Sequence, residues 1–110
     1  MIQIELFRNK NQNIVRFTVS GHAGFAESGA DIVCASVTTA AFTAVNGLTD
    51  IIKIEAIPQV SDGFLSCRLP EDLSPEQRLL SDVLLESMVL SFLNIEEQYG
   101  DYVKIKEFFI

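Results

Sequence analysis

Residues 21–34 read GHAGFAESGADIVC, and the rest of the chain is organised around this stretch. It contains His22, the only histidine, and Cys34, one of only two cysteines. Three of the six glycines also fall within it, namely Gly21, Gly24 and Gly29. Because glycine permits positive φ and close approach of another backbone, we expect a sharply bent loop that leads from a strand into a helix.

Asp31 predicts where that helix begins. Its carboxylate can accept the unpaired N–H groups of a first helical turn, so we expect Ile32 to be the first helical residue and Cys34 the third. The positive end of the helix dipole favours a thiolate at that position, and the thiolate is the nucleophilic form of cysteine. Two roles stay open for Asp31, because its carboxylate can either cap the helix or orient His22.

A Cys–His dyad is the functional hypothesis that these residues suggest. The loop between them is long enough to fold His22 back to within hydrogen-bond reach of Cys34, an arrangement that activates a thiol for covalent catalysis. Backbone N–H groups of the first helical turn, including that of Cys34, are then candidate donors to an oxyanion. The structural alternative is a cysteine buried as a small hydrophobe and a histidine satisfied within a turn.

The run GHAGFAESGADIVCASVTTA, residues 21–40, resembles the signature of the ribosomal-processing cysteine protease family called Prp. The match consists of Gly-His-Ala, a short loop, and Gly-x-Asp-Ile-Val-Cys-Ala opening a helix. The length and the order of elements resemble the family over the whole chain. The resemblance implies that Cys34 is the nucleophile and His22 the general base, with Gly21 and Asp31 in supporting positions.

Thr38 departs from the family pattern, which often has a serine one turn after the cysteine. The threonine keeps the hydroxyl and adds a methyl group. Its role in shaping the site is one hypothesis, and a hydrogen bond from its hydroxyl back to the backbone at Cys34 is the other. The loop of residues 24–29, formed by Gly24, Phe25 and Gly29 with their neighbours, is a candidate lid over a bound peptide. Anchoring of Phe25 to the core is the alternative.

The resemblance also implies a substrate and a partner. The expected reaction is removal of the N-terminal extension of large-subunit ribosomal protein twenty-seven, beside a phenylalanine-containing motif, during ribosome maturation. An apolar pocket near Cys34 is expected for such a motif, and the resemblance implies a homodimer. The alternative function is a non-catalytic peptide-binding module, such as a ribosome-assembly factor.

The composition predicts a single domain over residues 1–110, because 110 residues with 48% hydrophobic content can bury one sizeable core. We expect no apolar run that spans a bilayer and find no signal pattern at the N-terminus, so a cytoplasmic location without a membrane partner is predicted. The two cysteines are then expected to be thiols. With one histidine, neither a metal site nor a cofactor is predicted.

The net charge of −7, with no cluster of lysines or arginines along the sequence, argues against direct binding to nucleic acid phosphates. An acidic protein suits a basic partner, such as a lysine-rich segment of a ribosomal protein. The alternative is that the acidic surface is simply solvated.

Alternating apolar and polar residues predict the strands. A polar turn at residues 9–13 predicts a hairpin, and Asp62-Gly63 is a strong signal for a second one. Cys67 is expected to point into the core with its alternating neighbours Leu65 and Leu69. The strands are expected over residues 1–8, 14–20, 53–59, 64–69 and 102–109.

Two long helices complete the predicted fold. The first is expected over residues 32–52, and the second over residues 73–100, with a capping box formed by Ser74 and Gln77. The order is therefore ββαββαβ, an α+β domain with a mainly antiparallel five-stranded sheet packed with two long helices. The apolar stripe that should pack the second helix on the sheet comprises Leu80, Val83, Leu84, Met88, Phe92, Leu93 and Ile95.

Overall fold

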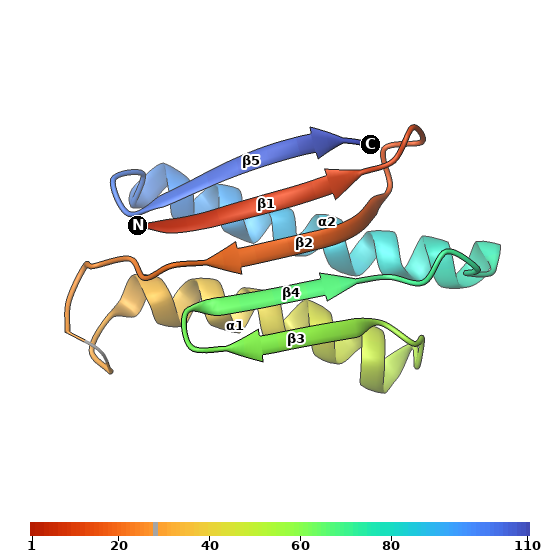
Figure 1. The fold of residues 1–110 in the computed structure, drawn as a ribbon, viewed down its shortest axis with the longest axis horizontal. Coiled ribbons are helices and arrows are strands. Elements are labelled where there is room, and N and C mark those ends of the chain that lie inside the picture. The colour runs from red at the N-terminus through yellow and green to blue at the C-terminus, as the bar shows by residue number, and fades with distance from the viewer. Residues whose placement is uncertain (28) are drawn as a thin grey trace.

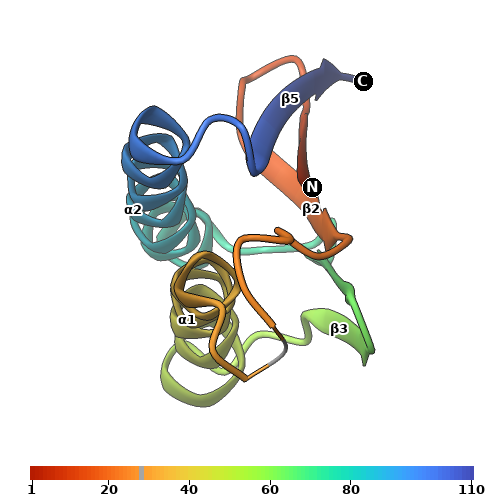
Figure 2. The same ribbon diagram turned by 90° about the vertical axis from the view of Figure 1, so that its left-hand side faces the viewer.

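Five strands form one sheet, and both helices cover the same face of it (Figure 1, Figure 2). The structure, a computed structural model, describes residues 1–27 and 29–110. The predicted order ββαββαβ and the α+β class are confirmed. In chain order the elements are β1 (Ile2–Arg8), β2 (Ile14–Ser20), α1 (Ile32–Asn46), η1 (Gly47–Ile51), β3 (Ile57–Ser61), β4 (Phe64–Arg68), α2 (Pro75–Gln98) and β5 (Val103–Phe109).

The sheet has the strand order β3-β4-β2-β1-β5. Three of its four pairings are antiparallel, which confirms the mainly antiparallel sheet. The fourth, between β1 and β5, is parallel, because the chain crosses over the sheet through α2 before β5 begins. This topology places β2, whose end carries the glycine-rich loop, at the centre of the sheet.

The β1–β2 hairpin has the predicted bounds to within one residue, since β1 begins at Ile2, but it contains an irregularity. Phe7 pairs with Arg16 and Arg8 with Ile14, so Val15 is left outside the register. Ile14 consequently occupies a core position and is only 1% exposed. A one-residue shift of this kind changes which side chains face the core.

The strand predicted over residues 53–59 is wrong in position. Lys53 has a φ of +63°, which is incompatible with an extended strand, and β3 begins only at Ile57. The turn at Asp62-Gly63 then fixes the register of β3 against β4, with Ser61 opposite Phe64. The predicted turn at Asp62-Gly63 is therefore confirmed. The start of β3 differs from the prediction because the chain first has to leave the end of η1.

Helix α1 begins at Ile32 as predicted and continues as the π-helical turn η1 to Ile51. Helix α2 begins with the predicted capping box between Ser74 and Gln77. Both helices bury apolar side chains against β1, β2 and β4. The core residues that are fully or almost fully buried include Ile4, Leu6, Phe17, Val33, Val37, Leu48, Cys67, Leu85, Phe92 and Val103.

The apolar stripe predicted for α2 is partly wrong. Leu80, Val83 and Leu93 are exposed, whereas Leu85 and Val89 are buried. The reason is that apolar residues surround much of this helix, so the pattern does not select one face. Ser81, a polar residue, occupies one of the buried positions and is 0% exposed.

One segment, Ile32–Ile51, is long enough and apolar enough to cross a membrane by length and composition, with a mean hydropathy of 1.4. We expected no such segment from the sequence, and by those two criteria that expectation is wrong. In the fold this segment packs on the sheet and on α2, and its inner residues belong to the core. A core helix meets the same length and composition criteria, so the finding does not by itself indicate a membrane span.

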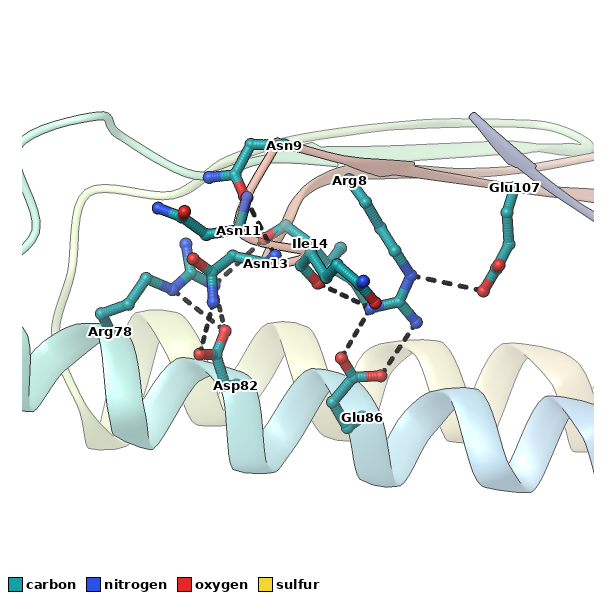
Figure 3. A network of polar contacts seen from close by, with 10 residues as sticks. Arg8, Asn9, Asn11, Asn13, Ile14, Arg78, Asp82, Glu86 and Glu107 are labelled. Carbon is teal, nitrogen blue, oxygen red and sulfur yellow. Dashed lines mark hydrogen bonds and ion pairs between the residues drawn. The ribbon is translucent and has the colours of Figure 1, made fainter. Parts of the chain in front are cut away.

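A network of polar contacts joins the β1–β2 hairpin to α2 at the end of the sheet away from the glycine-rich loop (Figure 3). Arg8 makes two hydrogen bonds to Glu86, at 2.7 and 3.0 Å, and a third to Glu107 at 3.3 Å. Asp82 accepts hydrogen bonds from Arg78 at 2.6 and 3.0 Å and from Asn13 at 2.8 Å. Charge-assisted and bidentate bonds of this kind fix orientation as well as distance. The network therefore fixes α2 against the hairpin that leads to the loop.

Candidate active site

A cavity of about 250 Å³ lies where the end of β2, the start of α1 and the β3–β4 turn meet. His22, Cys34 and Thr38 all line it, together with apolar side chains of the core. A larger hollow of about 660 Å³ lies between α1 and α2, and its described lining contains no thiol, imidazole or carboxylate. Because nucleophilic and proton-transferring groups converge only on the smaller of these two, it is the candidate active site.

Cys34 is the third residue of α1, as the sequence predicts. Its side chain is partly exposed to the cavity, and its Sγ accepts the backbone N–H of Ala23 at 3.3 Å. That hydrogen bond and the positive end of the helix dipole both stabilise negative charge on the sulfur. The sulfur is therefore accessible from the cavity at the N-terminal end of α1.

Asp31 joins the start of α1 to the preceding loop through both carboxylate oxygens. Its Oδ1 accepts the N–H groups of Val33 and Cys34, each at 3.0 Å. Its Oδ2 accepts the N–H groups of Phe25 at 3.0 Å and Ala26 at 3.4 Å. These hydrogen bonds, with that from Cys34 the most important, lower the pKa of Asp31 below the ordinary value.

These contacts decide two points that the sequence left open or predicted differently. Within the described residues Asp31 makes no hydrogen bond to His22, so the role that the structure shows for it is that of the helix cap. The Cys34 N–H, a candidate oxyanion donor from the sequence, donates to Asp31 in this structure. Ala23 supplies the backbone N–H that lies at the sulfur, and no sequence motif indicates this contact.

His22 lies two residues after the end of β2, beyond Gly21, and is largely exposed in the cavity. Its Nε2 lies 3.9 Å from Oδ2 of Asp62, a residue of the β3–β4 turn. The contacts of the described residues include no hydrogen bond between the imidazole and the Sγ of Cys34. The structure thus brings the two predicted catalytic residues into one cavity, and it adds Asp62, which sequence analysis identified only as part of a turn.

Two glycines allow the close packing around His22. Gly21 has a φ of +88°, and a Cβ there would collide with the backbone carbonyl of Met1. Gly63 has a φ of +65°, and a Cβ there would lie 2.8 Å from Nε2 of His22. The Gly21 N–H donates to the Gly63 carbonyl at 2.8 Å, which ties the β3–β4 turn to the residue before His22. The turn therefore forms the wall against which the imidazole lies.

Thr38 lines the cavity one turn after Cys34, and its side chain is exposed. Ser36 and Thr43 bond back to carbonyls of the preceding turn at 2.7 and 2.8 Å. No such bond is present for Thr38 among the described contacts. The simpler of the two hypotheses from the sequence is thus not supported.

Phe25 is anchored to the body of the protein, which was one of the two alternatives for this loop. Its ring packs edge-on against Tyr99 and Tyr102, with centroid distances of 5.6 and 5.2 Å. Gly24 and Gly29 have φ values of +72° and +89°, as a sharply bent loop requires. Ser28, which belongs to the predicted lid at residues 24–29, lies outside the described residues.

Cys67 behaves as the sequence predicts for a core cysteine. Its side chain points inward from β4 between Leu65 and Leu69, and it is 0% exposed. Burial raises the pKa of its thiol to about 11, so it stays protonated near neutral pH. Cys34 is therefore the thiol that is placed for chemistry.

The chain is similar to a known family and to solved structures. The family described as Cysteine protease Prp matches residues 1–104. The ribosomal processing cysteine protease Prp of Bacillus subtilis is 36% identical over 107 residues, covering 96% of either chain. The crystal structure of the ribosomal processing protease Prp from Staphylococcus aureus with a covalently linked product peptide has a TM-score of 0.87 and 25% identity, covering 97% of this chain and 99% of that chain. SMU.848 from Streptococcus mutans has a TM-score of 0.82 and 28% identity, covering 100% and 96%.

Replacement of Asp31 tests the electrostatic part of this description. The substitution Asp31→Asn keeps one acceptor oxygen and replaces the other by an amide nitrogen, which leaves two of the four N–H groups without an acceptor. Because the folded-state pKa is lowered, the stabilisation is present above the unfolded value of about 3.9 and is lost as the pH falls through the folded value. We expect the difference between the urea midpoints of the wild type and the variant to be large near neutral pH and to close in acid.

The matched control is Asp72→Asn, which removes an exposed carboxylate that has no hydrogen bond among the described contacts. Its midpoint should stay near that of the wild type across the pH series. A difference for Asp31→Asn that does not change with pH would show that the charge of the carboxylate contributes nothing to the loop–helix junction.

Proposed function

The chain belongs to the Prp family of ribosomal processing cysteine proteases, and on that premise we propose that Cys34 and His22 form its catalytic dyad. The proposal rests on the shared cavity. The Cys34 thiol, at the N-terminal end of α1, and His22, the only histidine of the chain, both line it. Catalytic hydrogen bonds are often long or absent before substrate binds. The proposal requires the exposed His22 side chain to turn toward the sulfur when substrate binds.

The proposed reaction proceeds in two steps. In the first, the Cys34 sulfur attacks the scissile carbonyl, and His22, which has taken the thiol proton, gives it to the leaving amine, so that a thioester forms. In the second, His22 removes a proton from water, and the resulting hydroxide attacks the thioester carbonyl. The carbon–sulfur bond breaks, the acyl group leaves as a carboxylic acid, and the Cys34 thiolate is restored beside the protonated His22. The backbone N–H of Ala23 is the donor we assign to the developing oxyanion, because it already lies at the sulfur.

We propose that the carboxylate of Asp62 is the group that interacts with the His22 imidazole. It is almost fully exposed, so its attraction to a protonated His22 is weakened by solvent. The steric wall made by Gly63 then contributes more to the position of the ring than the charge does. Asp31 in turn positions Cys34 through the start of the helix and does not act on the imidazole.

The substrate we propose is the N-terminal extension of large-subunit ribosomal protein twenty-seven. Its support is the similarity to ribosomal processing proteases and the product peptide bound to the Staphylococcus aureus relative. The floor of the cavity fits an apolar side chain of such a peptide, because it is built from Ile2, Val19, Val37, Ala41 and Leu65.

A cleavage assay tests the dyad and the substrate together. The purified protein is mixed with a peptide that spans the extension, and the products are located by mass spectrometry. We expect a single cut beside the phenylalanine-containing motif, no cut with Cys34→Ala, and a rate lower by roughly 10²- to 10⁴-fold with His22→Ala. Cys67→Ala, the matched loss of the other thiol, should continue to cleave.

Two outcomes would contradict parts of the proposal. Binding of the peptide without any cut would favour the peptide-binding module over the proteolytic function for this substrate. A cut that survives Cys34→Ala would remove the assigned nucleophile while leaving the substrate in place. Peptides with the motif scrambled separate recognition of the motif from general binding.

We also propose that the protein is a homodimer that pairs through the outer surfaces of its helices. Large apolar side chains on α2, among them Leu79, Leu90 and Leu93, are 44–64% exposed. Exposed apolar surface of this kind marks an interaction site.

Sedimentation equilibrium should give twice the chain mass for the wild type and the single mass for Leu90→Glu. The control Ile57→Glu, an exposed apolar residue on β3, should remain dimeric; a monomeric wild type would overturn the proposal.

A further inference from the structure

The face of the sheet opposite the helices is open (Figure 2), and the strand register arranges its side chains in rows. Residues that alternate with the buried ones, such as Phe7 between Leu6 and Arg8, point away from the helices. The register places one residue of each strand in a single line across the sheet. This line, which we call the cross-sheet row, consists of Phe108, Phe7, Arg16, Arg68 and Ile57.

The open face has a charge opposite to that of the protein. It carries four of the eight lysines and arginines, namely Arg16, Arg68, Lys104 and Lys106, but only one of the fifteen acidic residues, Glu5. None of the four cations forms an ion pair within the described residues. Lys104 turns toward the loop at Gly100, which leaves the other three to define a local basic surface.

Arg16 and Arg68 lie directly opposite each other on neighbouring strands. Like charges in this position destabilise a sheet. Both side chains are exposed, and neither has a carboxylate partner in the described part of the chain. The fold gains nothing from this pair, whereas an anion placed between the two guanidinium groups would benefit from both.

The aromatic half of the row is stacked. The rings of Phe7 and Phe108 are nearly parallel, 18° apart, with centroids separated by 5.2 Å. The guanidinium of Arg16 lies over Phe7 at 4.9 Å from its centroid. Phe7 is thus covered on both sides, while Phe108, on the edge strand, is 39% exposed. One aromatic face therefore remains for a further planar group at the edge of the sheet.

We propose that this open face binds a single-stranded nucleic acid. Arg16, Arg68 and Lys106 would contact phosphates, and a base would extend the stack on Phe108. A sheet that presents aromatic rings and cations together on a solvent-facing surface is the general platform for single strands. An acidic peptide would match the cations, but it would leave the stacked ring without a planar partner. The net charge of −7 argues against nucleic acid binding by the protein as a whole. The cations of the open face are distant in sequence, and they come together only because the strands pair.

The proposal implies a modest, salt-dependent affinity. Each phosphate contact to a single strand changes the slope of log K against log salt by about −0.7, so three contacts predict a slope of roughly −2. Fluorescence anisotropy of the full chain with labelled oligouridylate over a series of KCl concentrations measures this slope. Labelled oligothymidylate of the same length shows whether the 2′-hydroxyl matters, and binding of either strand with this slope supports the proposal.

Three variants identify the surface. Arg68→Gln should make the slope less steep by about 0.7. Phe108→Ala should weaken binding by at least about fivefold with the slope unchanged, because stacking of a base is lost. Lys10→Gln, which removes an exposed cation from the β1–β2 turn, is the matched control and should change neither quantity.

Several results would overturn the proposal. These are no binding at the lowest salt, a slope that Arg68→Gln does not change, or an affinity that Phe108→Ala does not reduce. Equal binding of a labelled polyglutamate peptide, insensitive to Phe108→Ala, would identify an acidic protein partner instead. A change in the sedimentation of Arg68→Gln relative to the wild type would identify the face as a contact between copies of the chain.

Discussion

The carboxylate of Asp31 holds together the two segments that carry the candidate chemistry. One oxygen binds the first turn of α1 and thereby fixes the position of Cys34, while the other binds the loop that follows His22. The Ala23 N–H can reach the sulfur because this loop turns back over the helix start. If the carboxylate were absent, the helix would lose its cap and the loop would lose its attachment at the same time.

The remaining elements place this junction against a rigid support. The central strand β2 ends at the cavity and so places His22 there. The β3–β4 turn limits where the His22 ring can lie. At the opposite end of the sheet, the bidentate hydrogen bonds from Arg8 to Glu86 and the hydrogen bond from Arg78 to the carbonyl of Ile14 fix the hairpin to α2. The proposed catalytic groups thus lie on a loop and at a helix start, and the packed sheet and helices around them form a rigid scaffold.

Features that depend on neighbours along the chain were predictable from the sequence. The helix start at Asp31, the capping box at Ser74 and the Asp62-Gly63 turn each rest on a local hydrogen bond or a local backbone preference. The two residues proposed for catalysis could also be identified, because one histidine and one helix-start cysteine fall within a glycine-rich stretch, and because the stretch resembles a family signature.

Features that depend on tertiary contacts were not predictable in this way. The strand before the Asp62 turn was placed too early, because the positive φ of Lys53 follows from how η1 ends against the core. The buried side of α2 was partly misassigned, since apolar residues on several sides of a helix do not select one face. The proximity of Asp62 to His22, and the alignment of Arg16 with Arg68, arise only when strands distant in sequence pair.

The central claim is that Cys34 forms a covalent intermediate with the peptide. The most direct measurement is to quench the protein in acid during turnover of the substrate peptide, digest it, and search the peptide that contains Cys34 for the added mass of an acyl group. The account predicts a thioester on Cys34 that disappears after treatment with hydroxylamine and is absent from Cys67. Turnover at a comparable rate with no acyl group on Cys34 at any time would contradict it.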